Sequence, residues 1–173
     1  FQEYSYLIKK MNFRIAILPI VKLLSSFISH LILLFIGMII VLACGLGFSF
    51  WWFQSIYYLL CMSIFLLGLS WNFASLQVFS KDVSQIVAVI LQFGFWITPV
   101  VWNFDMIPKQ YQIYFLFNPM FYIVDGYRRS FVFHEPFWER WQMTIYFWLV
   151  TSIILILGIF LFKKLRPHFA DVL

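Results

Sequence analysis

Residues 23–80 read LLSSFISHLILLFIGMIIVLACGLGFSFWWFQSIYYLLCMSIFLLGLSWNFASLQVFS and contain no Asp, Glu, Lys or Arg. Two further uncharged stretches lie between Asp82 and Asp105 and between Arg140 and Lys163. A helix that crosses a hydrocarbon core of about 30 Å needs roughly 20 apolar residues, and a charge at its centre costs about 2.5 kcal/mol or more. The chain is 64% hydrophobic and 11% charged, whereas an ordinary globular chain is roughly 25% charged. The sequence therefore predicts an all-α integral membrane protein.

The uncharged stretches predict four transmembrane helices, near residues 23–44, 53–77, 83–103 and 141–162. The last two stretches are each as long as one span. Residues 23–80 would extend roughly 87 Å as a single helix, so the chain must fold back within them. Gly45 and Gly47 weaken the helix there, and we expect the turn at residues 44–49.

The basic residues are divided unequally between the two sides of the membrane that these spans define. Four lie between the third and fourth spans, and eight lie on the side of the two termini. The positive-inside rule then places both termini in the cytoplasm. Because these residues flank apolar spans and form no stripe on a soluble face, nucleic-acid binding is not expected. The terminal-side residues are Lys9, Lys10, Arg14, Lys22, Lys81, Lys163, Lys164 and Arg166.

The segment 104–140, on the predicted outer side, is too polar to cross a membrane and unusually aromatic. Asn118 and Pro119 form a typical helix start, with Asn as the cap. Apolar residues then recur at helical spacing, opposite a face that carries Asp125, Arg128 and Arg129. A weaker stripe follows Pro108. We expect two short interfacial or re-entrant helices here, and the alternative is a connecting loop anchored by its aromatic side chains.

The sequence contains none of the common motifs for nucleotide binding, catalysis or metal binding. It has no phosphate-binding loop and no paired metal-ligand spacing, so neither a catalytic residue nor a metal site is expected. The polar side chains of Asn72, Gln77 and Gln92 do not titrate, which suits hydrogen bonds between helices or a polar path. No charge lies inside a predicted span, whereas a proton- or sodium-driven pump is expected to carry one. The energy for any transport would therefore come from elsewhere.

Residues 1–22 are both basic and apolar and lie on the predicted cytoplasmic side. Such a segment lies on anionic lipid or docks a partner. The motif Leu7-Ile8-Lys9-Lys10-Met11-Asn12-Phe13 opens a series that continues through Ser80-Lys81-Asp82, Phe95-Trp96-Ile97-Thr98-Pro99, Phe117-Asn118-Pro119-Met120 and Pro167-His168-Phe169-Ala170-Asp171. In order and spacing this series resembles the membrane permease of type-2 ATP-binding-cassette exporters, in the branch that exports lipid-linked polysaccharides, including O-antigen, and teichoic acids.

The resemblance implies a six-span permease of the bacterial plasma (inner) membrane, which works as a homodimer with a separate ATPase subunit. That subunit would hold the ATP and Mg²⁺. This chain would then be the carboxy-terminal part, without the first two spans, divided into a coupling segment (1–22), a permease domain (23–162) and a cytoplasmic tail (163–173). The resemblance also implies two contacts with the ATPase. One lies in residues 7–14, and the other is the turn at residues 80–82, which follows the predicted span 53–77. The residues concerned are Leu7, Lys9, Lys10, Phe13, Arg14, Lys81 and Asp82.

A polysaccharide path would need surfaces that sugars can slide along, and the C–H faces of sugars stack on aromatic rings. The candidate aromatic residues are Trp71, Phe73, Phe93, Phe95, Trp96 and Tyr122, although most aromatic side chains in such a chain face lipid or other helices. Arg128 and Arg129 near the exit would guide an anionic substrate. Alternatively, Asp125, three and four residues earlier, forms a structural ion pair with them, and this second interpretation is the one that we favour.

The sequence therefore predicts a non-enzymatic permease subunit of an ATP-driven exporter, which moves a lipid-linked polysaccharide or teichoic acid to the outer face of the membrane. Two alternatives stay open. One is a related permease that exports a drug or a lipid. The other is an integral-membrane transferase that acts on lipid-linked sugars, for which Asp105, Asp125, His134, Glu135 and Glu139 would be the candidate acids, bases or nucleophiles.

Overall fold

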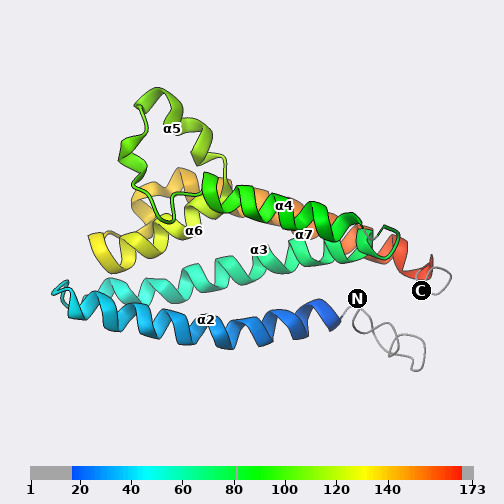
Figure 1. Ribbon diagram of the computed structural model, residues 1–173, viewed down its shortest axis with the longest axis horizontal. Helices are drawn as coiled ribbons and strands as arrows, with labels where there is room; N and C mark the ends of the chain where they lie inside the picture. The colour runs from blue at the N-terminus through cyan, green and yellow to red at the C-terminus, as the bar shows by residue number, and fades with distance from the viewer. Residues whose placement is uncertain (1–16, 81, 169–173) are drawn as a thin grey trace.

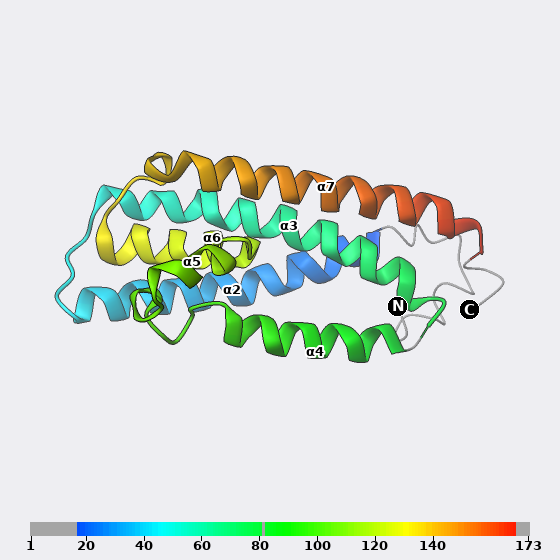
Figure 2. The same cartoon turned by 90° about the horizontal axis from the view of Figure 1, so that it is seen from above.

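The computed structural model describes residues 17–80 and 82–168, and the regular structure in them is helical. The four longest helices are α2 (Leu18–Ala43), α3 (Gln54–Gln77), α4 (Asp82–Ile97) and α7 (Trp141–Leu165). They lie side by side in an elongated bundle (Figure 1, Figure 2). We call the end that holds the start of α2, the end of α3, the start of α4 and the end of α7 the basal end, and the opposite end the apical end.

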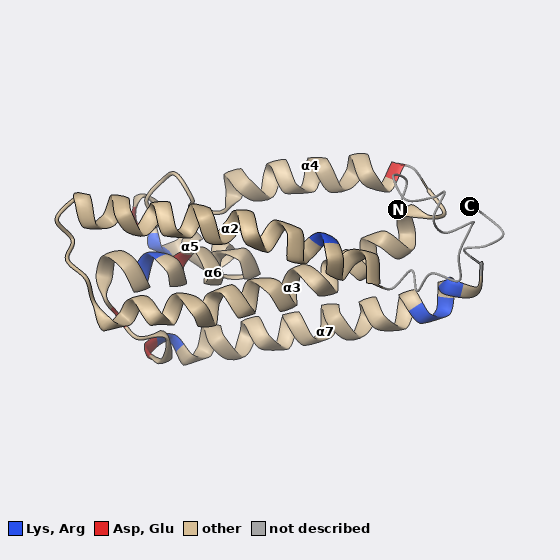
Figure 3. Ribbon diagram, turned by 90° about the horizontal axis from the view of Figure 1, so that it is seen from below, with Lys and Arg blue, Asp and Glu red and all other residues tan. Residues whose placement is uncertain are grey.

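The shorter elements gather toward the apical end of the bundle, except for η7, which follows the end of α7 at the basal end. Helices α5 (Lys109–Leu116) and α6 (Pro119–Arg128) lie between α4 and α7 in the chain. A π-helix, η5 (Arg129–Phe133), continues α6. Short 3₁₀ turns are η3 (Phe50–Phe53), η4 (Phe104–Met106), η6 (Phe137–Arg140) and η7 (Arg166–His168). In the ribbon of Figure 3 most positions coloured as charged residues lie toward the two ends of the bundle, and one basic position lies further in on α2. Most of the charge therefore lies where a membrane-embedded bundle can place it at low cost.

Three helical segments of the described chain are long and apolar enough to cross a membrane. They are Leu18–Ala43, Phe50–Gln77 and Phe137–Leu165. Of the four predicted spans, 53–77 and 141–162 fall within these segments, and 23–44 does so except for its last residue. The first helix begins five residues before its predicted start, so that Lys22 lies inside α2. The prediction of an all-helical membrane protein is therefore confirmed, whereas the count of four spans is not.

The predicted third span, 83–103, is wrong at its carboxyl end. Helix α4 ends at Ile97 after 16 residues, which corresponds to about 24 Å, less than a hydrocarbon core of about 30 Å. The Thr98 hydroxyl donates a hydrogen bond to the Gly94 carbonyl oxygen at 2.7 Å, and Pro99 follows. Because a residue before proline avoids the α conformation, the helix cannot continue.

The core of the bundle is the seam between α3 and α7, which pack along most of their length. The Asn72 side-chain amide on α3 donates to the Ile154 carbonyl oxygen on α7 at 2.8 Å, which confirms the predicted interhelical role of Asn72. A Cβ atom at Gly158 would lie 2.8 Å from both the Asn72 amide and the Gly68 carbonyl oxygen. The backbones can therefore approach here because position 158 has no side chain.

Candidate functional site

The candidate site is the apical assembly, which we define as α5, α6 and η5 together with the apical ends of α3, α4 and α7. Its first anchor is Asn118, whose Oδ1 accepts a hydrogen bond from the Met120 N–H at 3.0 Å. This contact confirms the helix start predicted at Asn118 and Pro119. The Asn118 amide also donates to the Thr98 hydroxyl at 2.8 Å. One residue thus caps α6 and fixes it to the end of α4.

The middle of α6 is buried between α3 and α7. Phe121, Tyr122 and Ile123 are buried, and Tyr122 and Ile123 belong to the same apolar cluster as Tyr58 of α3 and Phe147 of α7. Any side chain at Gly126 would overlap the Tyr58 ring. The sequence predicted one apolar face on this helix, but Phe121 and Tyr122, which are neighbours of Ile123 in the chain, are buried as well. The buried surface of α6 is therefore wider than a single helical face, because partners pack against more than one side of it.

Tyr122 joins three helices through hydrogen bonds. Its hydroxyl lies 2.9 Å from the Thr144 hydroxyl of α7 and 3.2 Å from the Tyr57 hydroxyl of α3. The Trp148 indole N–H donates to the same Tyr57 oxygen at 2.9 Å. Burial raises the pKa of Tyr122 and raises that of Tyr127 to about 12. Both phenols are therefore neutral at physiological pH and act as hydrogen-bonding groups.

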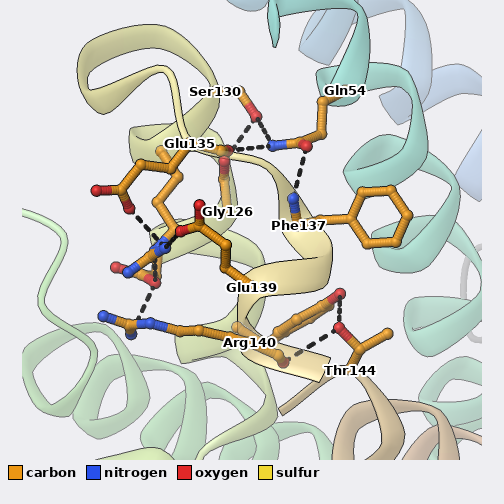
Figure 4. A network of polar contacts seen from close by, with 11 residues as sticks. Gln54, Gly126, Ser130, Glu135, Phe137, Glu139, Arg140 and Thr144 are labelled. Carbon is orange, nitrogen blue, oxygen red and sulfur yellow. Dashed lines mark hydrogen bonds and ion pairs between the residues drawn. The ribbon is translucent and has the colours of Figure 1, made fainter. Parts of the chain in front are cut away.

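An ion-pair cluster closes the apical assembly where α6 passes into η5 (Figure 4). Arg129 Nε lies 2.9 Å from Asp125 Oδ2, and Arg129 Nη1 lies 2.6 Å from Glu135 Oε2 and 3.8 Å from Glu139 Oε2. Arg140 Nη1 lies 3.1 Å from Asp125 Oδ2. Two arginines therefore meet three carboxylates around Arg129, whose side chain is largely buried.

Gln54, at the start of α3, ties this cluster to the rest of the bundle. Its amide donates to the Ser130 hydroxyl and to the Glu135 carbonyl oxygen, each at 3.1 Å. Its carbonyl oxygen accepts from the Phe137 N–H at 2.8 Å (Figure 4). All three contacts join residues more than 70 positions apart. Sequence reasoning missed Gln54, because a single glutamine at a helix start carries no signal about such distant partners.

Arg128 and Arg129, for which the sequence favoured an ion pair with Asp125 over a role in guiding substrate, have different surroundings. Arg129 forms the ion pair with Asp125, which confirms the structural interpretation for that residue. Arg128 instead donates from Nη2 to the Pro99 and Val100 carbonyl oxygens at 2.8 and 3.3 Å. It thus holds the bend after α4 against α6. This contact was not predicted, because it depends on where α4 ends.

The aromatic residues proposed for a substrate path do not share one surface. Tyr122 is 6% exposed within the core, and Trp71 and Phe73 are half-buried on α3. Phe93, Phe95 and Trp96 are exposed on α4. Phe93 and Trp96 are three residues apart and so share a helix face. Among the predicted path residues, Tyr122 is therefore part of the packed core, and only those on α4 present exposed aromatic side chains.

Most of the predicted ATPase contacts lie outside the described residues, namely Leu7, Lys9, Lys10, Phe13, Arg14 and Lys81. Asp82 is described and is the first residue of α4, where a carboxylate is favoured by the helix dipole. The candidate transferase residues Asp125, Glu135 and Glu139 are in the ion-pair cluster, and Asp105 lies apart in η4. Among the described residues, no group of three or more His, Cys, Asp or Glu is placed to hold a metal ion.

Comparison with known proteins yields a family model and two relatives. Two permease proteins named for O-antigen export, both called RfbA and both from Klebsiella pneumoniae, are 31% identical over 111 residues and 27% identical over 110 residues. Each match covers 64% of this chain and 41% of the relative, so the matched part spans well under half of these curated relatives. The family model described as ABC-2 type transporter matches residues 1–132, more than half of the chain. The chain therefore belongs to the ABC-2 type transporter family, and it is an integral membrane protein of the permease type.

Proposed function

We propose that this chain forms part of the membrane subunit of an ATP-driven exporter that passes a lipid-linked polysaccharide, such as O-antigen, or a teichoic acid to the outer face of the bacterial plasma membrane. The observation that carries the proposal is the family match over residues 1–132, together with two relatives whose names specify O-antigen export. In this proposal the chain makes no covalent change to its substrate. A partner ATPase subunit binds ATP and Mg²⁺.

The arrangement of the described helices supports an orientation for this subunit. The start of α2, the start of α4 and the end of α7, with Lys163 and Lys164 in its last turn, all lie at the basal end. Over the full sequence, eight of the twelve Lys and Arg residues lie on the side of the termini, so under the positive-inside rule the basal end would face the cytoplasm. Helix α4 would act as a fourth, short span. The chain after Ile97, which lies against the apical assembly, would cross the remaining thickness of the membrane. Residues 7–14 and the turn at Lys81 and Asp82 would touch the ATPase.

The apical assembly would bound the exit of the conduit. It is held to α3, α4 and α7 by Gln54, Asn118 and the Arg129 cluster, so a shift of these helices would move it as a unit. A second copy of the permease would face the exposed side of α4, and Phe93 and Trp96 would line the path between the copies. Engagement of Asp125, Glu135 and Glu139 in ion pairs argues against their use in transferase chemistry.

The coupling role is tested by copurifying the complete permease with its candidate ATPase and reconstituting both in lipid. The variant carries Lys9→Glu and Lys10→Glu. The matched control carries Lys163→Glu and Lys164→Glu, which make the same charge change in the last turn of α7. We expect the first pair to abolish association or permease-dependent ATP hydrolysis, and the control to retain both. Equal behaviour of the two pairs would contradict a specific coupling segment.

The substrate is tested in cells from which the permease gene is deleted. Restored surface polysaccharide on complementation, with an intracellular polymer pool in the uncomplemented strain, is the expected outcome. Export of a small lipid or drug without any effect on surface polymer would instead support the related permease function.

A further inference from the structure

Helix α7 lies at the edge of the bundle and packs with one face against α3 (Figure 2). The buried residues of α7 lie on that face and include Phe147, Thr151 and Gly158. The opposite face is exposed along the length of the helix. Its side chains follow one another at intervals of three or four residues and so form one stripe. We call these residues the α7 stripe: Trp141, Ile145, Leu149, Ile153, Ile156 and Phe160.

The middle of the α7 stripe consists of branched aliphatic side chains. Helices that pack against each other in lipid use small or polar side chains at the contact. The face of α7 that is turned to α3 has such residues in Thr151 and Gly158, whereas the stripe has none. The composition of the stripe therefore favours contact with acyl chains over contact with another helix.

The two ends of the stripe carry side chains that are typical of membrane interfaces. At the apical end, Trp138 of η6 is exposed like Trp141, and its ring centroid lies 5.5 Å from that of Trp51 in η3. At the basal end, Lys164 is exposed, and its Nζ lies 5.9 Å from the centroid of the Phe160 ring. Tryptophan lies at the headgroup level of a bilayer, and lysine near a helix end extends toward the headgroups. The order of tryptophan, aliphatic residues and lysine therefore matches the order of headgroup, hydrocarbon and headgroup.

The length of the stripe agrees with this order. From Trp141 to Lys164 the helix is roughly 35 Å long at 1.5 Å per residue. A hydrocarbon core is about 30 Å thick, and the bilayer with its headgroup regions is about 40–45 Å thick. Both ends of the stripe therefore reach the headgroup regions, while Ile153 lies near the centre. Glu139 and Arg140 have exposed side chains beside the apical tryptophans, which also places a polar layer at that level.

We propose that the α7 stripe is a surface that this chain turns to the lipid bilayer. Acyl chains of both leaflets contact its aliphatic middle, one headgroup layer lies at Trp138 and Trp141, and the other lies at Lys164. This assignment places α7 at the periphery of the complete permease, away from the substrate path and from a second copy. It rests on the chain being an integral membrane protein and not on the exported substrate, so either proposal can fail without the other.

Photocrosslinking of the complete permease in the membrane tests which molecules contact the stripe. The photoreactive residue p-benzoylphenylalanine replaces Phe160 in one variant and Leu149 in another. The matched control places it at Phe147, the same residue type on the buried face of α7. We expect phospholipid adducts at positions 149 and 160, detected by mass spectrometry, and crosslinks within the chain at position 147. Crosslinks from 149 and 160 to a second copy or to another protein segment would overturn the proposal, as would a lack of lipid adducts.

A pair of lysine substitutions tests where the stripe lies across the bilayer. Ile153→Lys places an ammonium group near the centre of the hydrocarbon, and it should lower the amount of folded permease recovered from membranes about tenfold or more. Phe160→Lys lies one turn from Lys164, where its side chain can extend to the same headgroups, and its recovery should stay within about twofold of the unaltered chain. Equal recovery of the two variants would overturn the assigned depth, because the stripe would then not cross the hydrocarbon as proposed.

Discussion

Helices α2 and α3 are both apolar, yet they occupy different environments. The apolar segment that contains α3 is less hydrophobic than α2, but it is the more buried of the two. Beyond Leu18 and Pro19, the residues of α2 are half-buried or exposed. In lipid, hydrophobicity does not drive one helix against another, and small or polar side chains select the packed faces instead. Hydropathy thus identifies both as membrane helices, while Asn72 and the close approach at Gly158 decide that α3 packs against α7.

The largest expected effect tests the packed seam directly. Phe147 on α7 is 0% exposed, whereas Phe160 on the same helix is 61% exposed. Phe147→Ala should lower the free energy of unfolding by about 3–5 kcal/mol through the cavity that it leaves. Phe160→Ala should cost far less, and thermal unfolding followed by size-exclusion chromatography in one detergent compares the two. Equal losses would show that α7 is covered on both faces in the complete protein.

The next effect concerns the ion-pair cluster that holds the apical assembly to this seam. Arg129→Met would leave Asp125, whose side chain is 18% exposed, with Arg140 as its remaining partner. We expect a loss of about 2 kcal/mol, below the value for a fully buried pair because Glu135 and Glu139 stay partly solvated.

Lys109→Met on α5 is the control for this prediction, since Lys109 is exposed. The same unfolding measurement applies to both variants. If the two substitutions have the same effect, the cluster contributes nothing to the attachment of α6, and the apical assembly depends on its apolar contacts alone.

A smaller effect is expected from the hydrogen bond across the α3–α7 seam. Asn72→Leu removes the donor to the Ile154 carbonyl oxygen, and such bonds in membranes contribute about 0.6–2 kcal/mol. Gln92→Leu on the exposed surface of α4 is the matched polar-to-apolar change, with little expected loss. A comparable loss of stability from Gln92→Leu would mean that α4 packs against a further partner. The packed seam of α3 and α7 and the exposed surface of α4 would then differ less in stability than the structure indicates.

The smallest effect tests how loosely α2 is attached. The contact between His30 Nε2 and the Tyr127 hydroxyl is long, at 3.3 Å, so His30→Leu should cost about 0.5 kcal/mol. Ser29→Leu, one residue away on the exposed side of α2, serves as the control in the same unfolding assay. If His30→Leu lowers the stability more than Asn72→Leu does, α2 is attached to the bundle as firmly as α3 is to α7. The proposed difference between α2 and α3 would then be wrong.

Some features of the site follow from local chemistry and were predictable. The start of α6 was predicted because an Asn cap and a following proline act within a few residues. The ion pair between Asp125 and Arg129 was predicted for the same reason, since residues four apart on a helix are neighbours. The early end of α4 was not predicted, although Pro99 gave the signal, because the absence of charge before Asp105 outweighed it. Gln54 and the Arg128 contacts depend on distant partners and left no local signal.

The sequence alone determined that the chain is a helical membrane protein, where its longest apolar helices lie, and how α6 begins. These features follow from the cost of burying charge in lipid and from hydrogen bonds that close within one helical turn. The tertiary structure alone decided which apolar helices form the core, which residues hold the apical assembly, and which face of α7 stays exposed. The physical reason is that helix pairing in lipid depends on the close fit of side chains distant in sequence, and no local pattern encodes that fit.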